Sequence, residues 1–319
     1  MSSARTPEFL QLFRGDAAAI REEIAQGLRA GPAAISPKYL YDALGARLFE
    51  AITELQQYYP TRTEAAIFEQ HRPAIAAAIG QGLVLVDLGA GNCQKAAALF
   101  GALQPSRYVA VDISVEFMRT AMLGLQRQYP ALPMLGVGMD FSGGLELPPQ
   151  VGPGRRLWFY PGSSIGNFSP GASLELLRQV RAGAQGGGLL IGVDLVKPLA
   201  VLEAAYDDDL GVTAAFNRNL LLHVNRLLGT DFDIRQWCHR AFFNVTQSRI
   251  EMHLQATQDL VVHWPGASRA FAQGEGIHTE NSYKYTSDGF EALLRQAGFG
   301  TVQRWSDSGE WFALFWAAN

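Results

Sequence analysis

Cysteine is scarce in this chain of 319 residues, since only Cys93 and Cys238 carry a thiol. Two cysteines so far apart build neither a disulfide framework nor a CxxC metal site, and they are typical of a reducing compartment. The six histidines show no HxxxH or HxH spacing. The sequence therefore predicts no metal site.

Charge and long apolar runs are limited as well. Charged residues make up 18% of the chain and the formal net charge is -4, which leaves no basic field for nucleic acid or an anionic membrane. The N-terminus lacks the cationic and apolar regions of a secretion signal, and no apolar run approaches the ~20 residues that span a bilayer. We expect a cytoplasmic, enzyme-like protein, and a monomer because few long exposed apolar stripes are evident.

One part of the chain alternates between short apolar runs and helical patterns. Such near-continuous apolar strands predict a parallel α/β sheet with helices on both faces. A helix and a terminal hairpin near the C-terminus would close this sheet, as in Rossmann-like methyltransferases that use S-adenosylmethionine (SAM). The predicted strands are 82–92, 107–114, 134–142, 156–160 and 187–196, followed by the helix 287–299 and a hairpin ending with 311–318.

Two other regions lack this rhythm and are expected to form a second lobe. Residues 36–52 look like one amphipathic helix with Ser36 as its cap and Pro37 in its first turn, broken by "YYPTRTEA" (58–65). The strand–helix rhythm also lapses between about 197 and 285. That segment is predicted to be helical over 204–237 and to form antiparallel strands at 248–256 and 259–264.

Polar and glycine residues follow three successive predicted strands. The turn "DLGAGN" (87–92) places Gly89 and Gly91 where a backbone can approach a ligand, but the third glycine of GxGxxG is missing. Asp112 ends the second strand, where an acid accepts ribose hydroxyls. Asp140 could accept the adenine amino proton and Phe141 could lie against the ring. Together these positions favour SAM over a nicotinamide dinucleotide, which carries a pyrophosphate.

Several longer motifs resemble one enzyme family over nearly the whole chain. They are "SPKYLYDALGARLFEAI", "YYPTRTEA", "GSSIGN", "DLVK", "AYDDDLGVTAAFNRN", "RIEMHL" and "TENSYKY". The chain resembles the histidine N-alpha-methyltransferases of ergothioneine biosynthesis. The resemblance implies a SAM-binding methyltransferase domain, residues 63–196 plus 286–319, and an α+β substrate-binding domain, residues 1–62 plus 197–285. It also implies methylation of L-histidine to hercynine, with up to three methyl groups added and S-adenosylhomocysteine as the second product.

The resemblance also assigns site residues by motif. The cofactor would be held by Gly89, Lys95, Asp112, Asp140 and Phe141. The amino-acid backbone of the substrate would be held by Asn167, Tyr206, Tyr58 and Tyr41, the imidazole would be read by Glu280 and Ser282, and the pocket would be lined by Gly162, Phe49 and Met252. Without the resemblance, the default interpretations are half-buried structural tyrosines, a solvated loop acid at Glu280 and a plain core residue at Met252. The turn "GAGNCQK" departs from the expected hydroxyl-rich pattern of the family at Asn92 and Cys93.

The expected reaction is an in-line displacement by the substrate's amine. An ammonium has no lone pair, so it must lose a proton first. Because no strong base is evident, we expect positioning to dominate, with water or a tyrosine, assigned as Tyr58, relaying the proton. A loose aromatic pocket would tolerate the growing cation through cation–π attraction of ~0.5–2 kcal/mol.

Three alternatives stay open at this point. The substrate could be another amino acid such as tryptophan or a derivative, although Glu280 argues against it. A nicotinamide-dependent oxidoreductase would need a third glycine and a sixth parallel strand. A non-catalytic binding protein would leave the polar strand ends unexplained.

Overall fold

The computed structural model describes residues 5–12, 16–113 and 115–319, and these fall into two units. Unit 1 contains Arg62–Leu195, Tyr285–Asn319 and the first strand, β1 (Glu8–Gln11). Unit 2 contains the segment that ends at Thr61 and the segment Val196–Lys284. We expected the N-terminal residues in the second lobe. Strand β1 instead belongs to unit 1, because it pairs in parallel with β5 (Met134–Gly138).

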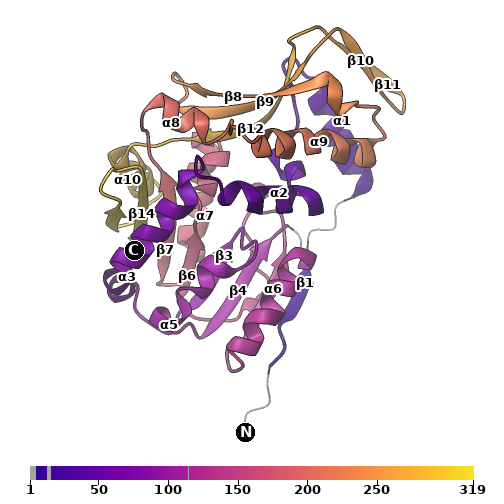
Figure 1. The fold of residues 1–319 in the computed structure, drawn as a ribbon. Helices are drawn as coiled ribbons and strands as arrows, with labels where there is room; N and C mark the ends of the chain where they lie inside the picture. Colours follow the sequence, from indigo (N-terminus) through magenta and orange to yellow (C-terminus); the bar gives the residue numbers. More distant parts are fainter. Residues whose placement is uncertain (1–4, 13–15, 114) are drawn as a thin grey trace. The chain divides into compact units, whose positions relative to one another are not determined.

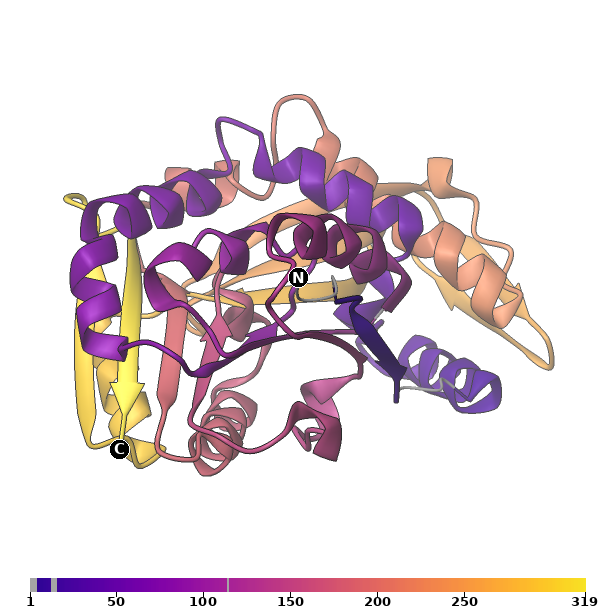
Figure 2. The same ribbon diagram turned by 90° about the horizontal axis from the view of Figure 1, so that it is seen from below.

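Unit 1 is built on an eight-stranded sheet of order β1-β5-β4-β3-β6-β7-β14-β13 (Figure 1). All pairs from β1 to β7 are parallel, whereas β14 runs antiparallel to both of its neighbours and forms the edge hairpin with β13 (Figure 2). The five predicted strands and the terminal hairpin are confirmed. The remaining strands of the sheet are β3 (Val84–Leu88), β4 (Arg107–Asp112), β6 (Arg156–Tyr160), β7 (Gly188–Asp194), β13 (Thr301–Ser306) and β14 (Phe312–Ala318).

Helices cover both faces of this sheet, because each strand is apolar on its two sides. One buried cluster joins the strands to α3 (Tyr59–Ile79), α5 (Phe100–Leu103) and α6 (Val115–Gln128). The other joins them to α7 (Pro170–Gly183) and α10 (Ser287–Gln296). The motif "YYPTRTEA", expected to break the helix at 36–52, lies beyond the end of that helix and opens α3. Between β3 and β4 the chain forms two short helices, α4 (Gln94–Ala97) and α5.

Unit 2 contains a four-stranded sheet of order β2-β12-β9-β8 and a separate hairpin (Figure 1). Helix α9 (Val212–Leu228) packs against two of the sheet strands and against α1 and α2. The other elements are α1 (Ala17–Arg29), β2 (Ala33–Ala34), α2 (Ala43–Thr53), α8 (Leu199–Ala204), β8 (Trp237–Asn244), β9 (Arg249–Ala256), β10 (Leu260–Trp264), β11 (Ala267–Phe271) and β12 (Gly276–Tyr283).

The helix expected at 36–52 is instead two helices. A short 3₁₀ helix, η1 (Pro37–Leu40), is followed by α2, and the chain turns between them. The reason is a second cap: the carboxylate of Asp42 accepts the Gly45 backbone N–H at 2.7 Å and so starts a new helix.

A bulge in β12 assigns neighbouring side chains to opposite faces of the sheet. His278 pairs with His253, but Glu280 pairs with the adjacent residue Met252, so Thr279 is an extra residue in β12. Residues directly paired across strands share a face. Met252 and Glu280 therefore lie on the face that α9 covers, where Asn217 of α9 contacts the His239 ring at 2.9 Å. His253 and His278 lie on the reverse face.

Within the described part of the chain, no helix is both long enough and apolar enough to cross a bilayer.

Candidate active site

The turn after β3 is an open, left-handed loop in unit 1. Gly89 and Gly91 have φ of +67° and +52°, a region that glycine adopts without strain. A Cβ built at Gly89 would meet nothing within 4 Å, so its backbone is accessible. The Gly91 N–H donates to Asp112 Oδ2 at 3.1 Å. A hydrogen bond thus joins the glycine turn to the acid at the end of β4, although Gly91 and Asp112 are 21 positions apart in the chain.

The third predicted cofactor position lies at the end of β5. Asp140 follows that strand and helps to line an open depression of the surface with Met139 and Leu145. Phe141 begins the short 3₁₀ helix η2 (Phe141–Gly143), and its ring meets that of Tyr160 edge to face at 6.0 Å between centroids. Parallel strands present their carboxyl ends at one edge of the sheet, which is where open α/β sheets bind ligands.

A buried acid outside the predicted site residues, Glu64, positions Lys95. Glu64 on α3 is only 1% exposed, and its Oε2 lies 2.6 Å from the Lys95 ammonium. Its other oxygen accepts the Gly162 backbone N–H at 2.7 Å. Glu64 therefore joins a predicted cofactor residue to a predicted pocket residue. Its only sequence signal was its place in "YYPTRTEA".

The acid inside the glycine motif has an unusual environment. Asp87 is buried in β3 and accepts the Tyr108 hydroxyl at 2.8 Å. Burial raises the pKa of Asp87 to about 7, against the opposing effect of the Tyr108 hydrogen bond. Burial and the charge of Asp87 also raise the pKa of Cys93 to about 12. The thiol stays protonated at neutral pH, which excludes it as a nucleophile.

The polar turn that follows β6, residues 161–167, is called the cup below, and two of its serines form hydrogen bonds that fix it. Ser163, with φ of +57°, accepts the Asp194 backbone N–H at 2.8 Å, and the Ser164 hydroxyl donates to the Pro161 carbonyl at 3.3 Å. Gly162 also has positive φ, and a Cβ there would approach the Lys95 ammonium to 3.2 Å. Asn167 ends the 3₁₀ helix η4 (Ser164–Asn167) that completes the cup.

In unit 2 the predicted pocket aromatics form one cluster. Phe49 contacts Tyr41 and Tyr58 edge to face, at 5.5 and 6.2 Å between ring centroids. Tyr58 in turn meets Tyr206 at 6.1 Å. Phe216 of α9, which the sequence analysis missed although it lies in the motif "AYDDDLGVTAAFNRN", contacts both Tyr41 and Phe49. Four aromatic residues chosen from three separate motifs are therefore neighbours.

A buried hydrogen-bond network connects this cluster to β12. The Tyr206 hydroxyl donates to Ser282 Oγ at 2.8 Å. The ammonium of Lys284, a residue only 3% exposed, donates to Ser282 Oγ at 2.8 Å and to the Tyr206 oxygen at 2.9 Å. Lys284 belongs to the motif "TENSYKY", but nothing in the spacing of that motif marks it as a site residue.

Glu280 is part of the same buried surface. It is 7% exposed and stands in a strand, so the default expectation of a solvated loop acid does not describe it. Its partner across the strands is Met252, which is 2% exposed. Glu280, Ser282 and Met252 therefore share the face of the sheet that α9 covers.

Comparison with known proteins gives the family. The family model described as "Histidine-specific methyltransferase, SAM-dependent" matches residues 20–319. The chain belongs to this family. A histidine N-alpha-methyltransferase of Mycolicibacterium smegmatis is 40% identical over 305 residues, which cover 93% of this chain and 94% of that protein.

Two further proteins are similar to this chain. A histidine N-alpha-methyltransferase of Mycobacterium tuberculosis is 38% identical over 94% of this chain and 95% of its own length. Ergothioneine biosynthesis protein 1 of Neurospora crassa is 29% identical over 88% of this chain, which corresponds to 33% of that longer protein. The predicted fold agrees with this membership: the sheet of unit 1 has the parallel core and antiparallel C-terminal hairpin expected of a SAM-dependent methyltransferase.

Proposed function

We propose that this protein transfers methyl groups from SAM to the α-amine of L-histidine and forms hercynine, the first step of ergothioneine biosynthesis. The observation that carries the choice of histidine is the pair Glu280 and Ser282, buried side by side on one face of β12. The relatives named as histidine N-alpha-methyltransferases support the same choice.

The pair matches the two nitrogens of a neutral imidazole. An ionised glutamate only accepts hydrogen bonds, so Glu280 suits the imidazole N–H. Ser282 Oγ already accepts from Tyr206 and from Lys284, which uses both of its lone pairs. The Ser282 hydroxyl proton then points away from Tyr206 and Lys284 and is available as a hydrogen-bond donor. Such a donor suits the unprotonated imidazole nitrogen. We infer that Lys284 sets this polarity.

The aromatic cluster fits the chemistry of the amine. A methylated amine loses its N–H donors and keeps a positive charge, so acceptors that gripped the free amine would disfavour the later steps. Rings can face such a cation at a gain of ~0.5–2 kcal/mol. We propose that Tyr41, Phe49 and Tyr58 line the amine's surroundings. Tyr206 and Asn167 are proposed to bind the carboxylate, and Gly162 to keep the pocket wall small.

The strand ends of unit 1 suit SAM. The accessible backbone at Gly89, the carboxylate of Asp112 and the acid–ring pair of Asp140 and Phe141 would hold the amino acid, ribose and adenine parts, and Lys95 would face the cofactor's carboxylate. When bound, SAM supplies a methyl group on a positively charged sulfur. We accordingly propose that unit 1 is the cofactor-binding domain and unit 2 the substrate-binding domain.

The proposed reaction needs a neutral amine with its lone pair aimed at that methyl. A nitrogen–carbon bond forms as the carbon–sulfur bond breaks, and S-adenosylhomocysteine leaves with the electron pair. The proton lost from each N–H goes to water, directly or through the Tyr58 hydroxyl. Positioning by the residues above supplies most of the acceleration, since alignment of two reactants lowers a barrier by ~7–11 kcal/mol. We further infer that the protein works as a cytoplasmic monomer.

The double variant Glu280→Ala/Ser282→Ala tests the choice of histidine. Loss of a charge-assisted and a neutral hydrogen bond is expected to lower kcat/KM for histidine about 100-fold. Any turnover of phenylalanine should change by less than about threefold, because its ring carries no nitrogen to pair with either residue. The control is Glu251→Gln, a carboxylate change on the reverse face, which should leave histidine turnover within about threefold. Unchanged histidine turnover in the double variant would refute the assignment.

A further inference from the structure

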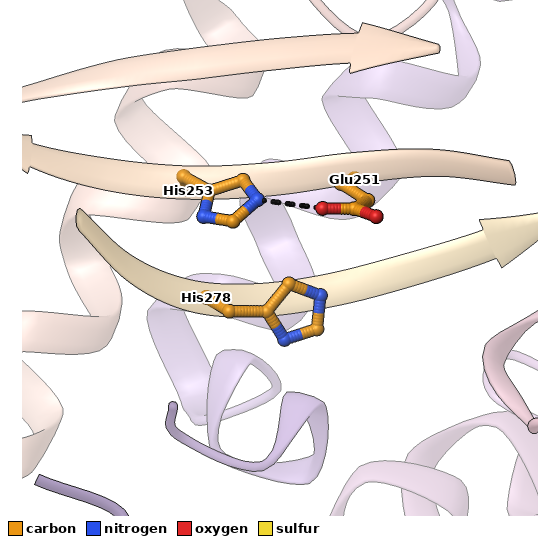
Figure 3. A group of neighbouring side chains, drawn as sticks. All are labelled: Glu251, His253 and His278. Carbon is orange, nitrogen blue, oxygen red and sulfur yellow. Dashed lines mark hydrogen bonds and ion pairs between the residues drawn. The ribbon is translucent and has the colours of Figure 1, made fainter. Parts of the chain in front are cut away.

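The reverse face of the unit 2 sheet carries a second cluster of polar side chains that the methyltransferase site does not use. Glu251 and His253 lie two positions apart on β9, so both project to the same side. His278 on β12 is the direct cross-strand partner of His253. Figure 3 shows the three side chains gathered over these two strands, with a ring nitrogen of His253 bonded to the Glu251 carboxylate.

We propose that Glu251, His253 and His278 form a binding site for a transition-metal dication, and that zinc(II) is the ion it suits best. Two imidazoles and one carboxylate are a donor set typical of zinc with one open position. The mixture of nitrogen and oxygen donors disfavours magnesium and calcium, which take oxygen ligands.

The spacing of the ligand atoms is close to what one ion requires. One ligand atom from each of the three residues lies within 4.8 Å of the other two. His253 Nε2 and Glu251 Oε2 are already 3.0 Å apart. Ligands at ~2.0–2.1 Å from a tetrahedral zinc are about 3.3 Å from one another. Any pair would thus close by at most about 1.5 Å, a movement of the size that side-chain rotation provides.

The carboxylate is held in the orientation that a metal needs. Arg249 and Asn244 both bind Oε1, at 2.7 and 2.8 Å, and leave Oε2 on the histidine side. Such outer hydrogen bonds orient ligands in metal sites. Arg249 offsets one negative charge, which moderates the affinity without blocking Oε2.

The histidine rings are held in place by their neighbours. His278 Nε2 pairs with Asn281 Oδ1 at 2.9 Å, which orients the His278 ring. The two rings meet edge to face at 5.1 Å between centroids, and Phe242 stacks on the other side of His253 at 5.4 Å. The rings are therefore held near each other before any ion binds.

Metal titration of the full chain tests this site. After treatment with a chelator, calorimetry with ZnCl₂ and visible absorption with CoCl₂ should each show one equivalent bound. His253→Gln and His278→Gln should each weaken binding by at least ~10-fold, because each removes a ligand. The matched control is His263→Gln, which changes an exposed histidine paired with Asp231 in another part of unit 2. It should bind as the unchanged protein does.

Three results would overturn the proposal. They are the absence of stoichiometric binding, equal binding by the His278→Gln variant, and binding that disappears with Cys238→Ser, which would assign the metal to the exposed thiol. Circular dichroism must show that each variant is folded. A rise in melting temperature with zinc, present in the His263→Gln control and absent in both ligand variants, is the expected second readout.

Discussion

The two faces of the β9–β12 sheet each bury a carboxylate, but they surround it differently. Glu251 and Glu280 are both 7% exposed. On the reverse face Glu251 is bound by a guanidinium, an amide and an imidazole, all from strands β8 and β9. On the α9 face Glu280 shares its strand with a serine whose lone pairs are filled by Lys284 and Tyr206. The first arrangement fixes an acid that a cation can use, and the second presents an acceptor beside a donor.

This difference has one structural cause, the bulge at Thr279. In a regular strand, positions 278 and 280 would point to the same side. The extra residue places His278 with His253 and Glu280 with Met252. The Thr279 hydroxyl donates to the Met252 carbonyl at 3.0 Å and holds the irregular segment. One inserted residue thus allows two chemistries to share one strand.

Of the effects predicted for the two faces of the sheet, the larger is a rise in KM for histidine when Lys284 is substituted. Lys284→Met removes the N–H donor that occupies one lone pair of Ser282 Oγ. The Ser282 hydroxyl can then rotate its proton away from the substrate and face the substrate as an acceptor. We expect KM for histidine to rise about 10-fold with kcat changed much less. Lys284→Gln keeps N–H donors and should recover part of the loss. Steady-state kinetics at fixed saturating SAM would show this.

The result that contradicts this role of Lys284 is specific. If kcat fell while KM stayed constant, Lys284 would act on the chemical step instead of on substrate recognition. If the methionine and glutamine variants behaved alike, its donors would not matter. Melting curves of both variants would separate these outcomes from a general loss of stability, since the removal of a buried charge changes packing as well.

A smaller effect, on the free energy of unfolding, is expected when a change of pH alters the charge of Glu251. Its pKa in the folded protein, about 2, is below the ordinary 4.5, so the ionised group stabilises the fold. That contribution is fully present above pH 4.5 and is lost as pH falls toward 2. At pH 7 the free energy of unfolding should exceed that of Glu251→Gln by roughly 1–2 kcal/mol, a value reduced for solvent screening.

Urea unfolding of both proteins between pH 7 and pH 3 would measure this difference. The gap should narrow as the solution becomes more acidic. A gap that is constant over this range would mean that the Glu251 charge does not stabilise the fold. Zinc should not be present, because a bound ion would add its own pH dependence.

Periodicity predicted unit 1 much better than unit 2. The buried parallel strands are continuous apolar runs, and the helices between them have clear caps, such as Ser169 before α7. The strand β1 was missed because its four residues, "EFLQ", carry no apolar pattern longer than two. Strand β12 was missed because it lacks an alternation of polar and apolar residues: "GIHTENSY" carries five consecutive polar residues, from His278 to Ser282.

The candidate site shows the same limit. Strand-end residues such as Gly89 and Asp112 follow from the topology alone. No spacing rule reveals Glu64 or Lys284, because Glu64 binds Lys95, 31 positions away, and Lys284 binds Tyr206, 78 positions away. The Glu251, His253 and His278 cluster escaped for the same reason. Sequence motifs for metal sites describe ligands spaced along one helix or strand, whereas these three ligands come from two paired strands, β9 and β12.

The central claim, methylation of histidine, is tested most directly by mass spectrometry of the product. The protein would be incubated with SAM and an equal mixture of L-histidine, L-tryptophan and L-phenylalanine. We predict that histidine alone gains mass, up to that of three methyl groups, with formation of S-adenosylhomocysteine. Methylation of another amino acid while histidine remains unchanged would contradict the proposed function.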